Sequence, residues 1–251
     1  MRRRRDVSAP HDGWTSELAS GIALAGFLAL VFVGFTLLAM GPLMSLDAYL
    51  NLDPAPPGWL PFLHVLDRIG QRAVNVPVLA VVAYVCSRRS ESWRPVVVAL
   101  LSTLTLNLVV GLLKIGLGRG QPESADPSFF VGGMAYPSGH TSNIILVYGL
   151  SVYLLGRYTR VPRRTIALLW SVVALLAVTM LVTSLTLNWH WFADLIAGLL
   201  IGSVILQLTV SLDHAVPSTA YETHIRPAMN RTLARIRRRP EPPALPRHDV
   251  P

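Results

Sequence analysis

The chain has 251 residues, of which 52% are hydrophobic and only 14% are charged. Soluble domains usually carry about 25% charged residues, so this composition excludes an ordinary soluble globule and excludes disorder along most of the chain. The net charge of +8 comes from 22 basic and 14 acidic residues, and every basic residue except Lys114 is an arginine. With Cys86 as the one cysteine, an intrachain disulfide and a cysteine-based metal cage are excluded as well.

Six apolar stretches are predicted to form membrane-spanning helices, because a bilayer core needs roughly 20 apolar residues per helix. They are Ala19–Met40, Val74–Cys86, Pro95–Leu113, Thr141–Leu155, Thr165–Leu187 and Leu195–Leu212. The second stretch is the weakest, since Asn75 and Pro77 interrupt it. The first is too long for the core of a signal peptide, and we expect it to remain as an anchor. The predicted fold class is therefore all-α, a polytopic membrane protein built as a six-helix bundle.

The distribution of basic residues predicts the orientation of this bundle. Most of the 22 arginine and lysine residues lie before the first helix, between the second and third, between the fourth and fifth, or after the sixth. The opposite side holds only Arg68, Arg72, Lys114 and Arg119. Because positive charge is retained in the cytoplasm, we expect a plasma-membrane protein with both termini cytoplasmic.

Three regions follow from this pattern: a basic N-terminus at 1–18, a transmembrane domain at 19–212 and a basic, proline-rich tail at 213–251. The tail cannot bury a core, and we expect it to be disordered near anionic lipid headgroups. A basic tail also suits nucleic acid, but the membrane helices favour lipid, so no nucleic-acid partner is expected. The proline-rich segment 41–71 is predicted to rest at headgroup depth.

Ionisable groups at the outer ends of membrane helices are costly to bury and call for a functional hypothesis. Lys114 ends the third predicted helix, and the segment Pro137–His140, with the sequence Pro-Ser-Gly-His, starts the fourth. Free backbone N–H groups and the positive end of the helix dipole favour an anion at such a start. His190 and Asp194 start the sixth helix, and their spacing of four puts both on one face. Each feature alone also fits a structural role: a snorkelling lysine, an ordinary helix start and a packing ion pair.

The topology places these groups at the outer edges of three helices, where they can meet in one pocket. Two histidines, one of them backed by a carboxylate, suit phosphoryl transfer, in which one imidazole attacks phosphorus and the other protonates the leaving oxygen. Fixed positive groups would stabilise charge on the equatorial oxygens. A zinc site is the competing use of these histidines. It needs three or four ligands at short range, and His64 is the candidate third ligand.

At these residues the chain resembles the type-2 phosphatidic acid phosphatase superfamily of membrane lipid phosphatases. The family pattern reads K-x6-R-P, then P-S-G-H, then S-R-x5-H-x3-D. The residues that match it are Lys114, Pro122, Pro137, Ser138, Gly139, His140, His190 and Asp194. Their order and spacing agree with the pattern, and the resemblance covers roughly residues 19–212.

The resemblance implies a role for each matched residue. His190 resembles the nucleophile that forms a phosphohistidine, Asp194 would orient it, and His140 would be the general acid. The residues implied to hold the phosphate are Lys114, Ser138 and Gly139. The resemblance also implies chemistry without a metal or other cofactor, and a lipid phosphate or diphosphate as the substrate at the extracytoplasmic face.

Both phosphate-binding arginines of the family pattern are replaced in this chain. Gln121 and Ser184 stand at those positions, and Thr183 stands at the serine position. Gln121 and Ser184 still donate hydrogen bonds, but neither provides the planar bidentate fork of arginine. A hydrogen bond to a charged group is worth roughly 1.5–3 kcal/mol, so we expect a weakened clamp unless a neighbouring arginine replaces it. The candidate replacements are Arg119, Arg68 and Arg72.

Three functions are compatible with this site. The preferred one is a membrane phosphatase that hydrolyses a lipid phosphate or polyprenyl diphosphate through a phosphohistidine. The second is a lipid-linked phosphotransferase that passes the phosphoryl group from the same histidine to an alcohol. The third is a catalytically weakened protein that binds lipid or a protein partner. A haloperoxidase shares a related histidine site with the superfamily, but the membrane helices and the replaced arginines argue against it.

Overall fold

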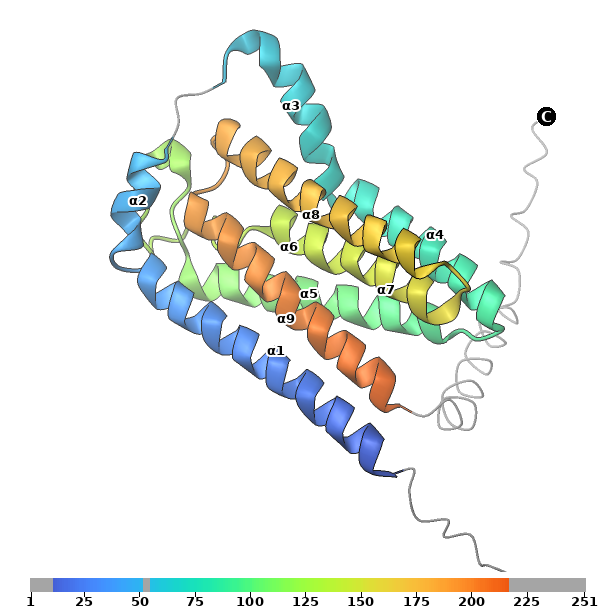
Figure 1. The fold of residues 1–251 in the computed structure, drawn as a ribbon. Coiled ribbons are helices and arrows are strands. Elements are labelled where there is room, and N and C mark those ends of the chain that lie inside the picture. Colours follow the sequence, from blue (N-terminus) through green and yellow to red (C-terminus); the bar gives the residue numbers. More distant parts are fainter. Residues whose placement is uncertain (1–10, 52–54, 217–251) are drawn as a thin grey trace, which may run out of the picture. The chain divides into compact units, whose positions relative to one another are not determined.

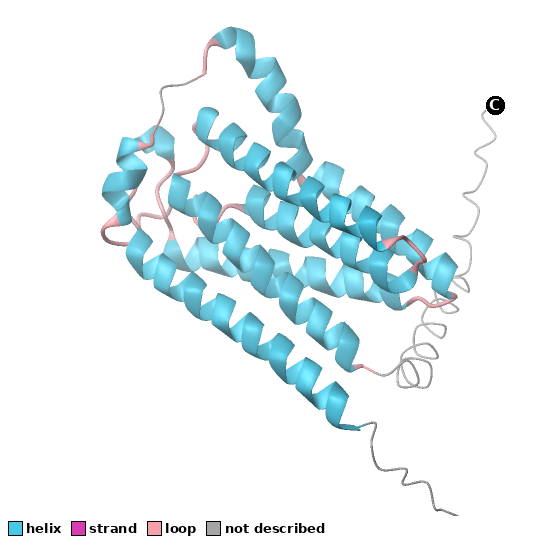
Figure 2. Cartoon of the chain, in the orientation of Figure 1, coloured by secondary structure: helices cyan, strands magenta, loops and turns pink. Residues whose placement is uncertain are grey.

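The computed structural model describes residues 11–51 and 55–216. Every regular element in these ranges is a helix, which confirms the all-α class (Figure 2). Most of the predicted tail, 213–251, and most of the predicted N-terminal region, 1–18, lie outside the described residues, as do the side chains up to residue 16.

Six helical rods make up the bundle, and each overlaps one of the predicted spans (Figure 1). Five of them are α1 (His11–Ala39), α4 (Arg72–Ser90), α5 (Arg94–Leu117), α8 (Arg163–Thr186) and α9 (Phe192–Ala215). The remaining rod is built from α6 (Gly139–Asn143), the π-helical stretch η4 (Ile144–Tyr148) and α7 (Gly149–Tyr158). The segment predicted to lie at headgroup depth contains α2 (Leu43–Tyr49), η1 (Pro57–Trp59), α3 (Leu60–Asp67) and η2 (Arg68–Gly70). The loop after α5 holds the short η3 (Pro122–Ser124).

The count of six spans is approximate. Four helices in the described ranges are long and apolar enough to cross a membrane: Glu17–Ala39, Arg94–Ser124, Arg163–Thr186 and Phe192–Ala215. A fifth span arises if α4 is joined to the preceding segment Pro57–Gly70, from which it is bent by 43°. The rod from α6 to α7 is interrupted by the π-helical stretch η4 and carries buried polar residues, which is consistent with a place inside the bundle.

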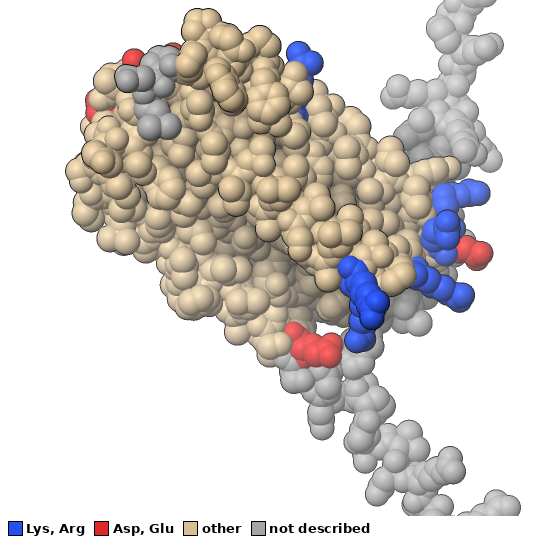
Figure 3. Space-filling view, turned by 45° about the horizontal axis from the view of Figure 1, so that its top comes forward, with Lys and Arg blue, Asp and Glu red and all other residues tan. Residues whose placement is uncertain are grey.

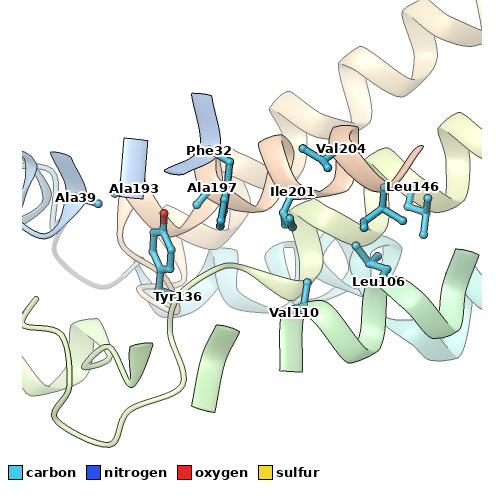
Figure 4. Close-up of a cluster of buried hydrophobic side chains, with 11 residues drawn as sticks. Phe32, Ala39, Leu106, Val110, Tyr136, Leu146, Ala193, Ala197, Ile201 and Val204 are labelled. Carbon is cyan, nitrogen blue, oxygen red and sulfur yellow. The ribbon is translucent and has the colours of Figure 1, made fainter. Parts of the chain in front are cut away.

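The core of the bundle lies along α9, the most enclosed of the four long apolar helices. Small and branched side chains on its inner face pack against α1, α5 and η4 (Figure 4). The labelled residues of α9 in this cluster are Ala193, Ala197, Ile201 and Val204. Large apolar side chains elsewhere, such as Leu30 of α1 and Leu175 of α8, are exposed, as expected for helices that face lipid.

The antiparallel helices separate the chain's connections into two ends. One end collects the α1–α4 connection, the loop from α5 to α6 and the turn from α8 to α9, and it therefore holds the motif residues. The opposite end carries the basic last turn of α4, together with the arginine-rich turn between α7 and α8. Figure 3 shows that most visible Lys and Arg side chains gather at one end, while the broad middle of this face is uncharged.

A buried ion pair fastens the helices at the arginine-rich end. Arg94 Nε, at the start of α5, donates to Asp213 Oδ1 at 2.7 Å. The Tyr153 hydroxyl donates to Asp213 Oδ2 at 2.6 Å, and the Tyr158 hydroxyl donates to Oδ1 at 2.8 Å. These contacts join α5, α7 and α9. Removing one member of such a buried pair leaves an uncompensated charge.

We therefore expect Asp213→Asn to lower the free energy of unfolding by about 3–5 kcal/mol, because the Arg94 charge would remain buried without its partner. Thermal unfolding of the purified protein in detergent measures this loss. The control is Glu91→Gln, an exposed carboxylate at the same end, which should change stability by about 0.5 kcal/mol or less. Equal unfolding temperatures for the two variants would contradict the role of the pair.

Candidate active site

A cavity of about 700 Å³ lies at the end of the bundle that collects the motif residues. Five of the predicted site residues line it: Lys114, Gln121, Gly139, His140 and His190. Other lining residues were not part of the family motif, and they include Gln71, Arg72, Asn143, Asn188 and Trp189. Three distant stretches of chain therefore share one cavity, as predicted from the topology.

His190 lies just before α9 and is held by a carboxylate in the first turn of that helix. Its Nδ1 is 3.4 Å from Asp194 Oδ2, and the same oxygen accepts a hydrogen bond from the Trp191 backbone N–H at 2.9 Å. Burial lowers the pKa of His190, against the opposing effect of the Asp194 charge. A lowered pKa keeps the imidazole neutral at pH 7, and pairing at Nδ1 leaves Nε2 available as a nucleophile.

His140 lies in the first turn of α6, and its ring centroid lies 6.4 Å from that of His190. Its Nε2 is 3.5 Å from Oδ1 of Asp67, whose side chain is fully buried at the end of α3. Sequence reasoning missed Asp67. The available signal was a single carboxylate at the end of the stretch Leu60–Asp67, in which His64 is the one other ionisable residue.

The zinc hypothesis required His64 as a third ligand. The structure instead places His64 against Trp189, with ring centroids 5.7 Å apart, and Trp189 in turn lies 6.2 Å from the His140 ring. His64 is not among the residues that line the cavity. Within the part of the chain that the structure describes, no three His, Cys, Asp or Glu side chains are grouped as metal ligands.

Arg119 does not point into the cavity, which corrects the prediction that it replaces a phosphate arginine. Gly118 ends α5 in the left-handed conformation, with φ of +50°, and the next side chain is completely buried. Arg119 Nη1 lies 2.6 Å from Asp194 Oδ1, and Nη2 contacts Asp47. Its Nε donates to the Pro127 carbonyl at 2.9 Å. Each guanidinium nitrogen is thus bonded to a protein group, and Arg119 does not line the cavity.

Asp47 brings α2 into the same buried network. Its Oδ1 accepts the backbone N–H of Ala193 at 2.9 Å, at the N-terminus of α9. A carboxylate is favourable at this position because the first N–H groups of a helix lack intrahelical partners. Asp47, Arg119 and Asp194 together fix the start of α9 and, through it, the position of His190.

Ser138 and Ser184 are completely buried and do not line the cavity, so the structure gives no support to a direct phosphate contact by either hydroxyl. The Ser138 backbone N–H donates to the Asp194 carbonyl at 2.9 Å, which ties α6 to α9. The Ser184 hydroxyl contacts the Met180 sulfur at 3.6 Å. The structure places both serines in the packing around the site.

Two cationic side chains do line the cavity. Lys114 donates to the carbonyl oxygens of Met134 and Ala135, the latter at 3.4 Å, and is directed toward the loop before α6. Arg72 is the first residue of α4 and is exposed. Of the three candidate replacements for the missing arginines, Arg72 is the one that the structure places at the cavity.

The buried network predicts that Arg119→Gln lowers the free energy of unfolding by about 3–5 kcal/mol, since two carboxylates would lose their shared counterion. Gln121→Ala is the matched comparison, because Gln121 lines the cavity and is exposed, and it should change stability by about 0.5 kcal/mol or less. Chemical unfolding in detergent measures both. The structural assignment of Arg119 fails if its substitution leaves the unfolding transition unchanged.

Comparison with known proteins bears on the family and the fold of the chain. A family model of the PAP2 superfamily matches residues 95–216, a segment that contains all the motif positions from Lys114 to Asp194. The fold is similar to a structure described as the crystal structure of the first transmembrane PAP2 type phosphatidylglycerolphosphate phosphatase from Bacillus subtilis. The TM-score is 0.66 at 18% identity, and the match covers 77% of this chain and 98% of that chain. None of the curated proteins compared with the chain matches it. Residues 95–216 of this membrane-spanning chain therefore match the PAP2 superfamily, and its fold is that of a transmembrane PAP2 type phosphatase.

Proposed function

We propose that the protein is an integral membrane phosphatase that hydrolyses a lipid phosphomonoester or diphosphate through a phosphohistidine on His190. One observation carries the proposal: two imidazoles with ring centroids 6.4 Å apart line one cavity, and each has a buried carboxylate within 3.5 Å of one ring nitrogen. This arrangement supplies a nucleophile and a separate proton donor to a single phosphorus atom.

In the first half-reaction, Nε2 of His190 attacks phosphorus and forms a P–N bond. The bond between phosphorus and the lipid oxygen breaks, and that oxygen takes a proton from the His140 imidazolium. Asp194 stabilises the positive charge that develops on the His190 ring, since it already pairs with Nδ1. The products are phosphorylated His190 and the lipid alcohol, or the lipid monophosphate when the substrate is a diphosphate.

In the second half-reaction, water attacks the phosphorus of the phosphohistidine. Neutral His140 accepts a proton from this water, the P–N bond breaks, and inorganic phosphate leaves. His190 returns to its neutral form and His140 returns to its protonated form. The cycle conserves protons and needs no other reactant.

Charge on the phosphoryl oxygens is stabilised by the groups that line the cavity. Lys114 and Arg72 supply positive charge, Gln121 supplies an amide donor, and the Gly139 backbone N–H lies at the start of the helical rod. Such fixed donors are effective because they need no reorganisation as charge moves onto the transferring group. Arg72 thereby takes over part of the function of the two replaced arginines.

The proposal places the site at the extracytoplasmic face. The cavity lies at the end of the bundle opposite the arginine-rich turns, and positively charged connections are retained on the cytoplasmic side. A substrate embedded in the outer leaflet would present its phosphate at this depth while its tail stays among the exposed apolar side chains. Membrane lipids are accordingly the partners that we expect.

The direct test is phosphate release from phosphatidate and from a polyprenyl diphosphate by the purified full-length protein in detergent, with EDTA present. We expect turnover that His190→Ala reduces by about 10³-fold or more, while His64→Ala, a histidine outside the cavity, has little effect. Absence of turnover on every lipid phosphate, or equal turnover by His190→Ala, would refute the proposal. A phosphoenzyme that decays only when an alcohol is added would indicate the phosphotransferase instead.

The position of Arg72 at the cavity gives a second prediction. Arg72→Ala should lower kcat/KM for a lipid phosphate by about 10- to 100-fold, because a charged hydrogen bond is worth about 1.5–3 kcal/mol. Arg68→Ala is the matched control, since Arg68 is exposed four residues earlier and does not line the cavity. Steady-state kinetics on both variants measures the difference. Equal effects of the two substitutions would count against a specific phosphate contact by Arg72.

A further inference from the structure

Asp67 is a fully buried carboxylate that lies outside the family motif. Its Oδ2 accepts a hydrogen bond from Gln71 Nε2 at 2.8 Å. Its Oδ1 accepts no hydrogen bond within the described residues and lies 3.5 Å from His140 Nε2. A buried carboxylate oxygen without a partner is costly, so the imidazole of His140 is the group that this oxygen is placed to bind.

Asp67 lies at the corner between α3 and α4, which is formed by residues 67–70. This corner is held against the rod that begins with α6. The carbonyl oxygen of Gly70 accepts hydrogen bonds from the Asn75 side chain at 3.0 Å and the Asn143 side chain at 3.4 Å. The Tyr148 hydroxyl donates to the Ile69 carbonyl at 3.0 Å. Because these donors come from α4, α6 and η4, the corner is fixed from several sides.

Gly70 allows this corner to approach His140 closely. A Cβ atom at residue 70 would lie 3.0 Å from both Cβ and Cδ2 of His140 and 2.8 Å from Cε of Met180. Contacts this short require a neighbour to move, and His140 is one of the two neighbours. The absence of a side chain at Gly70 therefore helps to set the distance between Asp67 and the imidazole.

We propose that Asp67 is a positioning residue for the general acid, an inference that rests on the proposed function. Asp67 accepts the Nε2–H of His140 and so fixes the ring in one tautomer and one orientation, with Nδ1 directed to the cavity. In the transfer step, the Nδ1–H bond of the imidazolium breaks and an O–H bond forms on the leaving lipid oxygen. The Nε2–H bond stays intact throughout, and the Asp67 carboxylate stabilises the imidazolium before transfer.

The result is a site with two histidine–carboxylate pairs that face each other. Asp194 holds the nucleophile His190 through Nδ1, and Asp67 holds the acid His140 through Nε2. The two carboxylates come from α9 and α3, elements far apart in the sequence. A purely structural role for Asp67, that of fastening α3 to the bundle, predicts a different kinetic pattern.

Leaving groups of different basicity separate these two roles. An alkyl phosphate such as lysophosphatidate needs a proton on its leaving oxygen, whereas p-nitrophenyl phosphate releases a stable phenolate without one. We expect Asp67→Asn to lower kcat on the alkyl ester by about 10- to 100-fold, part of the contribution of a general acid. We expect less than about a 3-fold effect on the aryl ester and an unchanged KM for both.

His140→Ala provides the reference for this experiment. It should show the same selectivity with a larger loss, and the double variant Asp67→Asn/His140→Ala should be no slower than His140→Ala alone. Asp126→Asn, an exposed carboxylate in the loop after α5, should leave both activities unchanged. Equal losses on the two esters by Asp67→Asn, or multiplicative losses in the double variant, would overturn the positioning role.

A readout without turnover keeps this inference separate from the proposed function. Nitrogen-15 NMR of the histidine-labelled full-length protein in detergent reports the tautomer of each ring, and His140→Gln identifies the signal. We expect neutral His140 to carry its proton on Nε2, and Asp67→Ala to convert it to a mixture of tautomers. An unchanged tautomer in Asp67→Ala overturns the inference, whether or not the wild-type protein turns over a lipid.

Discussion

Arg119 lies between two buried carboxylates, Asp47 and Asp194, and the geometry of the catalytic end depends on this interaction. Asp194 alone would be a buried negative charge at the start of α9. The guanidinium neutralises it, holds one of its oxygens and leaves the other to face His190. Asp47 balances the arginine and binds the N-terminus of the same helix. A change in any of the three charges would therefore alter the orientation of His190.

This network explains why Arg119 does not take the place of the missing phosphate arginine at the cavity. Arg119 is two residues from the position where the family pattern has a phosphate arginine, yet its side chain is enclosed by Phe129, whose ring centroid is 4.7 Å from the guanidinium carbon. Positive charge at the cavity comes instead from Lys114 and from Arg72 on α4. One arginine thus organises the protein interior, and another lines the cavity.

Composition and helix-length apolar stretches were enough to predict an all-α membrane bundle, because a lipid environment allows few alternatives for the backbone. The meeting of His140, His190 and Lys114 could be predicted as well, since antiparallel helices bring every second connection to the same end. The exact span count was less predictable, because the rod from α6 to α7 is interrupted by η4 and partly polar.

Contacts between side chains from distant segments could not be predicted. Spacing within a helix reveals which residues share a face, and this was sufficient for His190 and Asp194. It carries no information about Asp47 and Arg119, which are 72 residues apart, or about Asp67 and His140, which come from different elements. The direction of the Arg119 side chain depends on those partners, so its enclosure between two carboxylates could not be predicted from the sequence.

The most direct test of the account is an experimental structure of the protein with orthovanadate, which adopts the five-coordinate geometry of a phosphoryl group in transfer. We expect vanadium bonded to Nε2 of His190, its oxygens near Lys114 and Arg72, and Arg119 still between its two carboxylates. Vanadate bound to another residue would contradict the assignment of His190 as the nucleophile. Arg119 turned into the cavity to contact vanadate would contradict its role between Asp47 and Asp194.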